Sequence, residues 1–232
     1  MLVDIFSTFD DNNFVFMSYY LLMWVLSLTC VFLFFCSNKW VGYSSFNELI
    51  NLFKQISFSQ SIRSFGSKMG GFSLVLSSFF VMLVNMNLAG LMPYVFSVTA
   101  HLSLSLSFGI CFWLSLIISG FAYKPLVAAS GLLPVGAPSF LNPFLVLVET
   151  VSICFRPLTI SVRLVANISA GHIILGLIGM YMSQGIFCYS FLALGVVVFV
   201  EVGYFIFEFG VGLIQGYIFF LLITLYSDEH PH

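Results

Sequence analysis

The feature that most constrains this fold is a pair of long apolar segments near the end of the chain, residues 140–182 and 186–226. Neither segment contains a polar loop that would divide it into two shorter helices. A continuous helix of about 40 residues is roughly 60 Å long, which is about twice the hydrocarbon thickness of a bilayer. We therefore expect two long helices that are steeply tilted or bent, with a bend at Pro157.

The composition requires a membrane for the whole chain. Hydrophobic residues make up 60% of the 232 residues, 29 residues are phenylalanine, and charged residues contribute only 7%. A soluble domain of this length has too little interior to bury so much apolar side chain. The sequence thus predicts an all-α integral membrane protein that forms a single polytopic domain over residues 1–232.

The earlier part of the chain contains shorter apolar runs. We predict a first span at residues 14–36 and a helical hairpin at 72–123, whose two spans are 72–98 and 102–123. Between them, apolar residues of the segment 44–69 recur at helical intervals opposite polar ones. This pattern is typical of a helix that lies on the membrane surface, so we expect three upright or near-upright spans, one interfacial helix and the two long helices.

Five basic residues lie in the loops and the interfacial segment: Lys39, Lys54, Arg63, Lys68 and Lys124. If the N-terminus is outside, all five lie on the inner side of the membrane, as the positive-inside rule requires. The two long helices then cross and return, which places the C-terminus on the inner side as well.

Charged residues inside the two long segments are candidates for function: Glu149, Arg156, Arg163, Glu201 and Glu208. A charge at mid-membrane costs at least about 2.5 to 3.5 kcal/mol, and such charges usually face a pathway or a partner within it. An ion pair that only holds helices together is the alternative. We favour function for the set as a whole.

The spacing groups these residues into faces. Glu149, Arg156 and Arg163 are seven residues apart, so they share one slowly drifting stripe, which Asn167 joins. His172 points to the opposite side, about 13 Å further along the axis. On the second helix, three polar residues repeat the interval of seven: Glu201, Glu208 and Gln215.

The residue types in this pattern suggest a barrier between two proton paths. Arginine keeps its proton at physiological pH, whereas glutamate and histidine can bind and release one. A permanent cation between two sets of proton-exchanging groups separates them and does not relay protons. This is the logic of two half-channels that must not be joined.

Four stretches, in this order and spacing, resemble subunit a of the F-type ATP synthases: "NLAGLMPYVFSVTAHLS" (87–103), "FLVLVETVSICFRP" (144–157), "RLVANISAGH" (163–172) and "EFGVGLIQGYIFFLL" (208–222). The resemblance covers residues 72–226 well. It implies a non-catalytic membrane subunit whose two long, tilted helices pack against a rotating ring of c subunits, each bearing one carboxylate.

The resemblance also implies roles for individual residues. Arg163 matches the essential arginine, which attracts the ionised ring carboxylate and stops protons passing straight through. Glu149 matches the acid of the outlet half-channel. The polar groups of the inlet half-channel match Asn167, His172, Glu208 and Gln215.

Two charged residues have no fixed counterpart in the family pattern and are accessory candidates. Arg156 could pair with a lipid phosphate, another subunit or Glu149. Glu201 could widen the inlet half-channel or have a purely structural role as a protonated side chain, and we favour the structural role.

The resemblance further implies the surroundings of the chain. Histidine at position 172 is usual in mitochondrial relatives, whereas bacterial ones commonly have glutamate, so we expect the mitochondrial inner membrane and consider a bacterial plasma membrane second. The N-terminus would face the intermembrane space and the C-terminus the matrix. Expected partners are the c-subunit ring, peripheral-stalk and other membrane subunits, the lipid bilayer and protons, with no nucleic acid and no cofactor.

Other readings of the sequence remain open at this point. A secondary transporter is one alternative, although no internal repeat pairs the two halves. A membrane subunit of a respiratory complex is another. The small-residue pairs Gly212/Gly216 and Ala166/Ala170 predict close helix packing. The resemblance implies that such faces also let the ring pass nearby, and the two predictions are compatible.

Overall fold

The computed structural model describes residues 24, 25, 27, 29, 45–92, 95–131, 140–188 and 190–230. Throughout these ranges the regular elements are helices, and four of the helices are long and apolar enough to cross a membrane. These are Phe72–Gly90, Leu102–Tyr123, Asn142–Gly185 and Phe191–Asp228. The all-α membrane fold is thus confirmed, while the predicted first span at 14–36 lies almost entirely outside the described residues.

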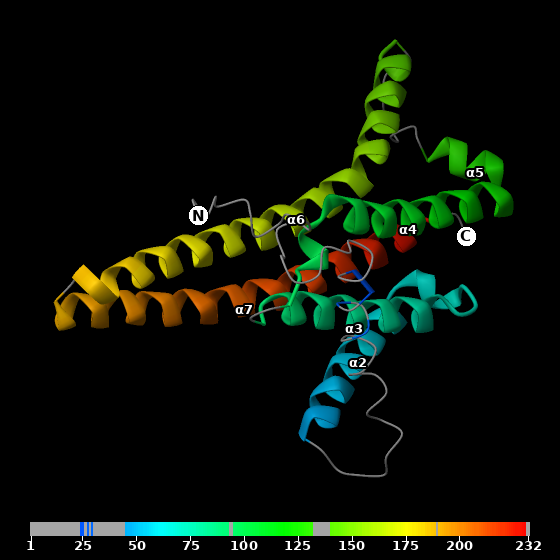
Figure 1. Cartoon of the computed structure of the whole chain (residues 1–232). Helices are drawn as coiled ribbons and strands as arrows, with labels where there is room; N and C mark the ends of the chain where they lie inside the picture. The colour runs from blue at the N-terminus through cyan, green and yellow to red at the C-terminus, as the bar shows by residue number, and fades with distance from the viewer. Residues whose placement is uncertain are drawn as a thin grey trace.

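The two long helices are present. Helix α6 runs over Asn142–Cys188 (47 residues) and helix α7 over Phe191–Asp228 (38 residues). Figure 1 shows α6 as two limbs that meet at a bend, with the longer limb lying beside α7. Pro157 lies inside α6. Its missing N–H and its ring explain the bend, because both disrupt the helical hydrogen bonds of the preceding turn.

The two helices of the predicted hairpin are α3 (Phe72–Gly90) and α4 (Leu102–Tyr123), which run in opposite directions (Figure 1). Helix α3 ends at Gly90, earlier than the predicted boundary at residue 98, and a short 3-10 turn, η4 (Val98–Ala100), precedes α4. Gly90 and Pro93 in the sequence both disfavour continuing the helix. Each hairpin helix packs on a different long helix, α3 on α7 and α4 on α6.

The segment predicted to be interfacial contains helix α2 (Ser45–Arg63) and the 3-10 turn η3 (Phe65–Lys68). Helix α2 is not among the candidate membrane spans of the described residues. Its Ile50 is buried in the core, whereas Leu49 and Ile56 are exposed. The position of this helix on the membrane surface stays a prediction. A short helix, α5 (Pro125–Ser130), follows α4.

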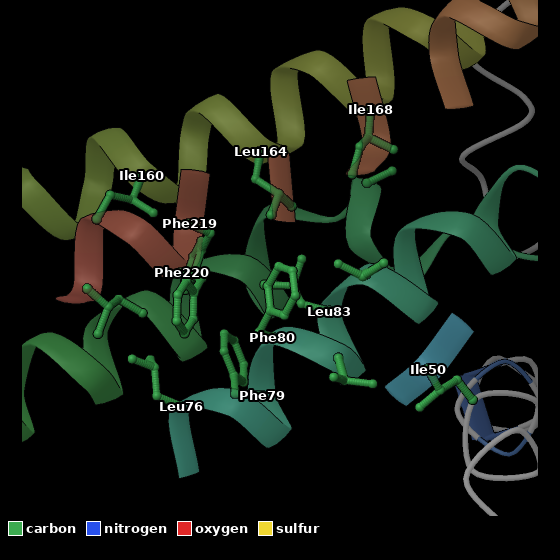
Figure 2. Packing of buried hydrophobic residues seen from close by; sticks show 14 residues of the cluster. Ile50, Leu76, Phe79, Phe80, Leu83, Ile160, Leu164, Ile168, Phe219 and Phe220 are labelled. Carbon is green, nitrogen blue, oxygen red and sulfur yellow. The ribbon is translucent and has the colours of Figure 1, made fainter. Parts of the chain in front are cut away.

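The core lies where α3, α6 and α7 meet (Figure 2). Phe79 and Phe80 of α3 contact Phe219 and Phe220 of α7, with ring centroids 5.5 and 5.3 Å apart. Helix α6 adds a row of buried aliphatic side chains: Ile160, Leu164 and Ile168. Helices α6 and α7 contact each other directly, and α3 packs against α7, so this shared core fixes the relative level of the polar groups on the two long helices.

Candidate functional site

The first polar cluster surrounds Glu208, whose side chain is only 3% exposed. A Cβ atom at Gly171 of α6 would overlap the Glu208 carboxylate, so the carboxylate occupies the space that the missing side chain leaves. Tyr204, one turn earlier on α7, interacts with the same carboxylate through its hydroxyl. We call Tyr204, Glu208, Gly171 and His172 the Glu208 cluster.

His172 joins this cluster because it directly follows Gly171. Its Nε2 lies 4.0 Å from the place that a Cβ would take at Gly90 of α3. Also on α3, the Asn87 side chain donates a hydrogen bond of 3.1 Å to the backbone carbonyl of Gly212. Helix α3 therefore lines the cluster at the level of both Glu208 and His172.

Three members of this region were not among the predicted site residues: Asn87, Gly171 and Tyr204. Asn87 could have been found, since a buried amide in an apolar span is itself a functional signal. Tyr204 and Gly171 carry no such signal. A glycine in a membrane helix is common, and only the position of Glu208 on the other helix shows why this one matters.

The second site is Arg163 on the longer limb of α6. Its side chain is exposed on the surface of the chain, and it lines a small crevice together with Gln215 of α7, which is buried. Asn167, one turn further on, is half-buried. Among the described residues no carboxylate forms an ion pair with Arg163. Its charge acts on Tyr226 of α7, and no described carboxylate neutralises it.

The third site surrounds Arg156. Its Nη2 lies 3.6 Å from Glu149 Oε1, and its Nη1 pairs with Glu229 just past the end of α7. The guanidinium also lies 5.0 Å from the ring centroid of Tyr226. We call these four residues the Arg156 cluster.

The Arg156 cluster shows which partners Arg156 has, a question that the sequence left open. Of the partners considered for Arg156, the structure shows Glu149, and it adds Glu229, which sequence reasoning missed. Glu229 stands in a polar tail, where charged residues are ordinarily solvated. The contact between Glu149 and Arg156 agrees with the predicted shared stripe. Glu201 is half-buried and makes no ion pair with any described residue.

The three sites follow one another along α6. Arg163 is seven residues after Arg156 and nine before His172, or roughly 10 and 13 Å along a helix axis. The buried carboxylate of Glu208 and the partly exposed carboxylate of Glu149 thus lie on opposite sides of Arg163, and the guanidinium between them keeps its proton at physiological pH.

The small-residue pairs have different surroundings. A Cβ at Gly216 would lie 2.8 Å from Val84 Cγ2, and one at Gly212 would lie 3.8 Å from Asn87 Cβ, so α3 covers this face. Gly212 and Gly216 are therefore close-packing positions within the chain, and a ring-facing role for this pair stays a prediction. Ala166 and Ala170, in contrast, are exposed.

Comparison with known proteins gives consistent matches over nearly the whole chain. A family model described as "ATP synthase A chain" matches residues 17–228. ATP synthase subunit a of Branchiostoma floridae is 35% identical over 239 residues, covering 99% of this chain and all of the relative. The same subunit of Artemia franciscana is also 35% identical, over 229 residues with the same coverage. That of Albinaria caerulea is 41% identical over 157 residues, which cover 68% of this chain and 72% of the relative.

Proposed function

Because the chain belongs to the ATP synthase A chain family, we propose that it forms two offset proton half-channels beside a rotating ring of c subunits. At the coarser level, it is a proton-translocating, multi-pass inner-membrane subunit of mitochondrial type that works together with other ATP synthase subunits. Because the chain belongs to this family, the two alternatives that the sequence left open, a secondary transporter and a membrane subunit of a respiratory complex, are not needed. The observation that carries the finer proposal is the unpaired charge of Arg163 between two proton-exchanging clusters.

The inlet half-channel corresponds to the Glu208 cluster, with Asn167 and Gln215 on the path toward Arg163. His172 can exchange protons near neutral pH, and Glu208 is a second acceptor at the same level. Tyr204 and Asn87 add hydroxyl and amide groups that can support water or a proton in transit. Protons that reach this level neutralise a ring carboxylate, which can then move into the lipid.

Arg163 separates the two paths. It attracts each ionised ring carboxylate that approaches, and it cannot itself carry a proton across. A ring carboxylate must therefore lose its proton before it passes Arg163 and must gain another one afterwards. Each proton therefore stays on the ring for almost a full turn, while the ring advances by one c subunit for every proton that is transported. Each proton that crosses provides about 2.3 kcal/mol per 100 mV of membrane potential.

The outlet half-channel corresponds to Glu149 in the Arg156 cluster. Glu149 is 40% exposed, so water can take the proton that it receives from the ring. Glu201 remains an accessory group on α7. The N-terminus would face the intermembrane space and the C-terminus the matrix, as the basic residues predict.

Exposed apolar side chains on the long helices support a ring-facing surface. Neighbours of Arg163 on α6 include Val162 and Leu158, which are 42% and 44% exposed. On α7 the exposed side chains include Phe205, Ile206, Phe209 and Ile214. An apolar surface around one cation fits partner helices that each present a single carboxylate. Peripheral-stalk and other membrane subunits would bind elsewhere.

The proposal is tested by Arg163→Ala in the complete complex, in inner-membrane vesicles whose matrix side faces the medium. We expect ATP-driven acidification to fall to background, because ring carboxylates can no longer be held in ionised form at the barrier. Arg63→Ala, which removes an exposed cation from α2, is the matched control and should pump normally. Normal pumping by an assembled Arg163→Ala complex would disprove the barrier.

A further inference from the structure

The Arg156 cluster contains one guanidinium and two carboxylates. Glu149 and Glu229 both face Arg156, from α6 and from the residue that caps the end of α7. Two acids and one base leave the cluster with one uncompensated negative charge when both acids are ionised. Within the cluster, the single guanidinium cannot neutralise both carboxylates, so the two glutamates compete for Arg156.

The contacts are unequal. Glu229 pairs closely with Nη1 of Arg156, whereas Glu149 lies 3.6 Å from Nη2, beyond the length of a good hydrogen bond. Arg156 is thus held mainly by Glu229, and Glu149 is the weakly paired acid. The Tyr226 ring below the guanidinium favours the same position of Arg156.

The end of α7 is attached on both sides, so Glu229 has a defined place. Asp228 accepts a hydrogen bond of 2.8 Å from the backbone N–H of Phe65. On the other side, His230 Nε2 lies 3.1 Å from Ser119 Oγ on α4. Glu229 stands between these two attachments, and its carboxylate is directed to Arg156.

A cavity of about 290 Å³ adjoins the cluster. Its lining includes Trp113 and Gly120 of α4, Thr150 and Cys154 of α6, and Glu229 and His230 at the end of α7. The titratable or charged groups of the described residues around Arg156 are thus Glu149 and Cys154 on α6, Tyr226, Glu229 and His230 from α7 and its end, and Arg163 of α6, whose charge also acts on Tyr226. The α4 residues that line the cavity carry no charge. Arg156 is the cation that contacts both glutamates directly.

We propose that Glu229 is a positioning residue of the proton outlet: it competes with Glu149 for Arg156 and so keeps Glu149 able to bind and release protons. The inference rests on the proposed outlet role of Glu149. Without the second carboxylate, Arg156 would pair with Glu149 alone and stabilise its ionised form. In the working cycle, Glu149 takes a proton from a ring carboxyl and gives it to water, while Arg156 and Glu229 keep their charges.

The test is Glu229→Gln in the complete complex, assayed as ATP-driven pumping in vesicles whose matrix side faces the medium. In this direction protons enter the ring through Glu149. Since Glu149 then faces Arg156 alone, a lower pH is needed to protonate it. We expect the pH profile of pumping to move toward acid by about half a pH unit to one unit.

Three further variants make the result specific. Asp228→Asn also removes one negative charge from the end of α7, but Asp228 does not pair with Arg156. This variant should leave the pH profile of pumping unchanged. Glu229→Asp keeps the carboxylate and should restore most of the original profile. In a chain that already carries Arg156→Gln, Glu229→Gln should not shift the pH profile further toward acid. Without Arg156, the loss of Glu229 cannot strengthen an ion pair between Arg156 and Glu149.

Several results would overturn the inference. An unshifted Glu229→Gln profile would do so, as would an equal shift with Asp228→Asn, which would indicate a general surface-charge effect. Loss of the assembled complex in both Glu229 variants would make the residue structural. If Arg163→Ala abolishes pumping while Glu229→Gln is unshifted, only this inference fails; if Arg163→Ala pumps normally, the proposed function itself fails.

Discussion

At the scale of single residues, two arginines of the same helix have opposite surroundings. Arg156 is 21% exposed and bound by carboxylates on two helices. Arg163, seven residues later, is exposed and pairs with no described carboxylate. A buried or paired guanidinium has its charge satisfied within the chain, whereas an unpaired one attracts an acid from outside. The same residue type is therefore paired within the chain at one place and, at the other, fits the barrier role that we propose for it.

Gly171 gives a residue-scale prediction. Gly171→Ala places a methyl group where the Glu208 carboxylate now lies. Overpacking of this kind costs roughly 1 to 3 kcal/mol, so displacing Glu208 should lower ATP-driven pumping by about fivefold or more.

Gly176→Ala is the matched control for this prediction. It lies on the same helix, and its new Cβ would have nothing within 4 Å, so pumping should be unchanged. Equal pumping rates for the two variants, at equal amounts of assembled complex, would contradict the role assigned to Gly171.

At the scale of elements, helix α3 has the largest influence on the site. It packs against α7 through Gly212 and Gly216, and it reaches the Glu208 cluster through Asn87 and Gly90. Small residues allow two helices to approach closely in lipid, where helix association depends on packing and polar contacts. Helix α3 therefore holds α7 at the height where Glu208 meets Gly171.

Gly216 provides the element-scale prediction. Gly216→Ala would bring a Cβ to within 2.8 Å of Val84 Cγ2, so α3 and α7 must separate. We expect a loss of about 1 to 3 kcal/mol in stability, measured as a lower temperature at which the complex loses this chain.

Two comparisons make the Gly216 prediction specific. Val84→Ala removes the clashing atom, so the double variant Val84→Ala/Gly216→Ala should recover much of the lost stability. Gly210→Ala, whose Cβ meets nothing within 4 Å, should have no effect. If Val84→Ala does not rescue, the clash is not the cause.

At the scale of the whole molecule, the helices form one assembly around a shared core, and the end of the chain is attached to it. Helix α4 packs on α6 at the level of Ser161, whose single hydroxyl proton lies between two backbone carbonyl acceptors, those of Ser105 at 3.1 Å and Pro157 at 2.8 Å from Oγ. Pro157 lies inside α6, which Figure 1 shows as a bent helix. The hairpin thus supports the bent helix as well as the helix that returns beside it.

A disulfide across α4 and α6 tests this arrangement. A Cβ at Gly109 would lie 3.9 Å from Ser161 Cβ, within the range that disulfides need. In Gly109→Cys/Ser161→Cys we expect mild oxidation to join the two helices, detected by mass spectrometry of the linked peptides, with pumping retained because α4 and α6 form one body.

The control pair for the disulfide is Gly109→Cys with Gly176→Cys, which lies four turns further along α6. It should give no cross-link under the same conditions. Cross-linking of both pairs to the same extent would show that α4 does not hold this position on α6.

The sequence by itself determined the membrane fold and the two long helices, and it singled out the charged residues of those helices as candidates for the site. These follow from local physics: a lipid-embedded backbone must satisfy its hydrogen bonds within the helix, and a charge in an apolar run stands out against its neighbours. Only the tertiary structure decided that Glu208 needs Gly171, that α3 covers Gly212 and Gly216, and that Glu229 shares Arg156 with Glu149. These pairings join residues far apart in the chain, and they arise because side-chain packing among α3, α6 and α7 sets the helices at one relative height, which no periodicity within a single helix encodes.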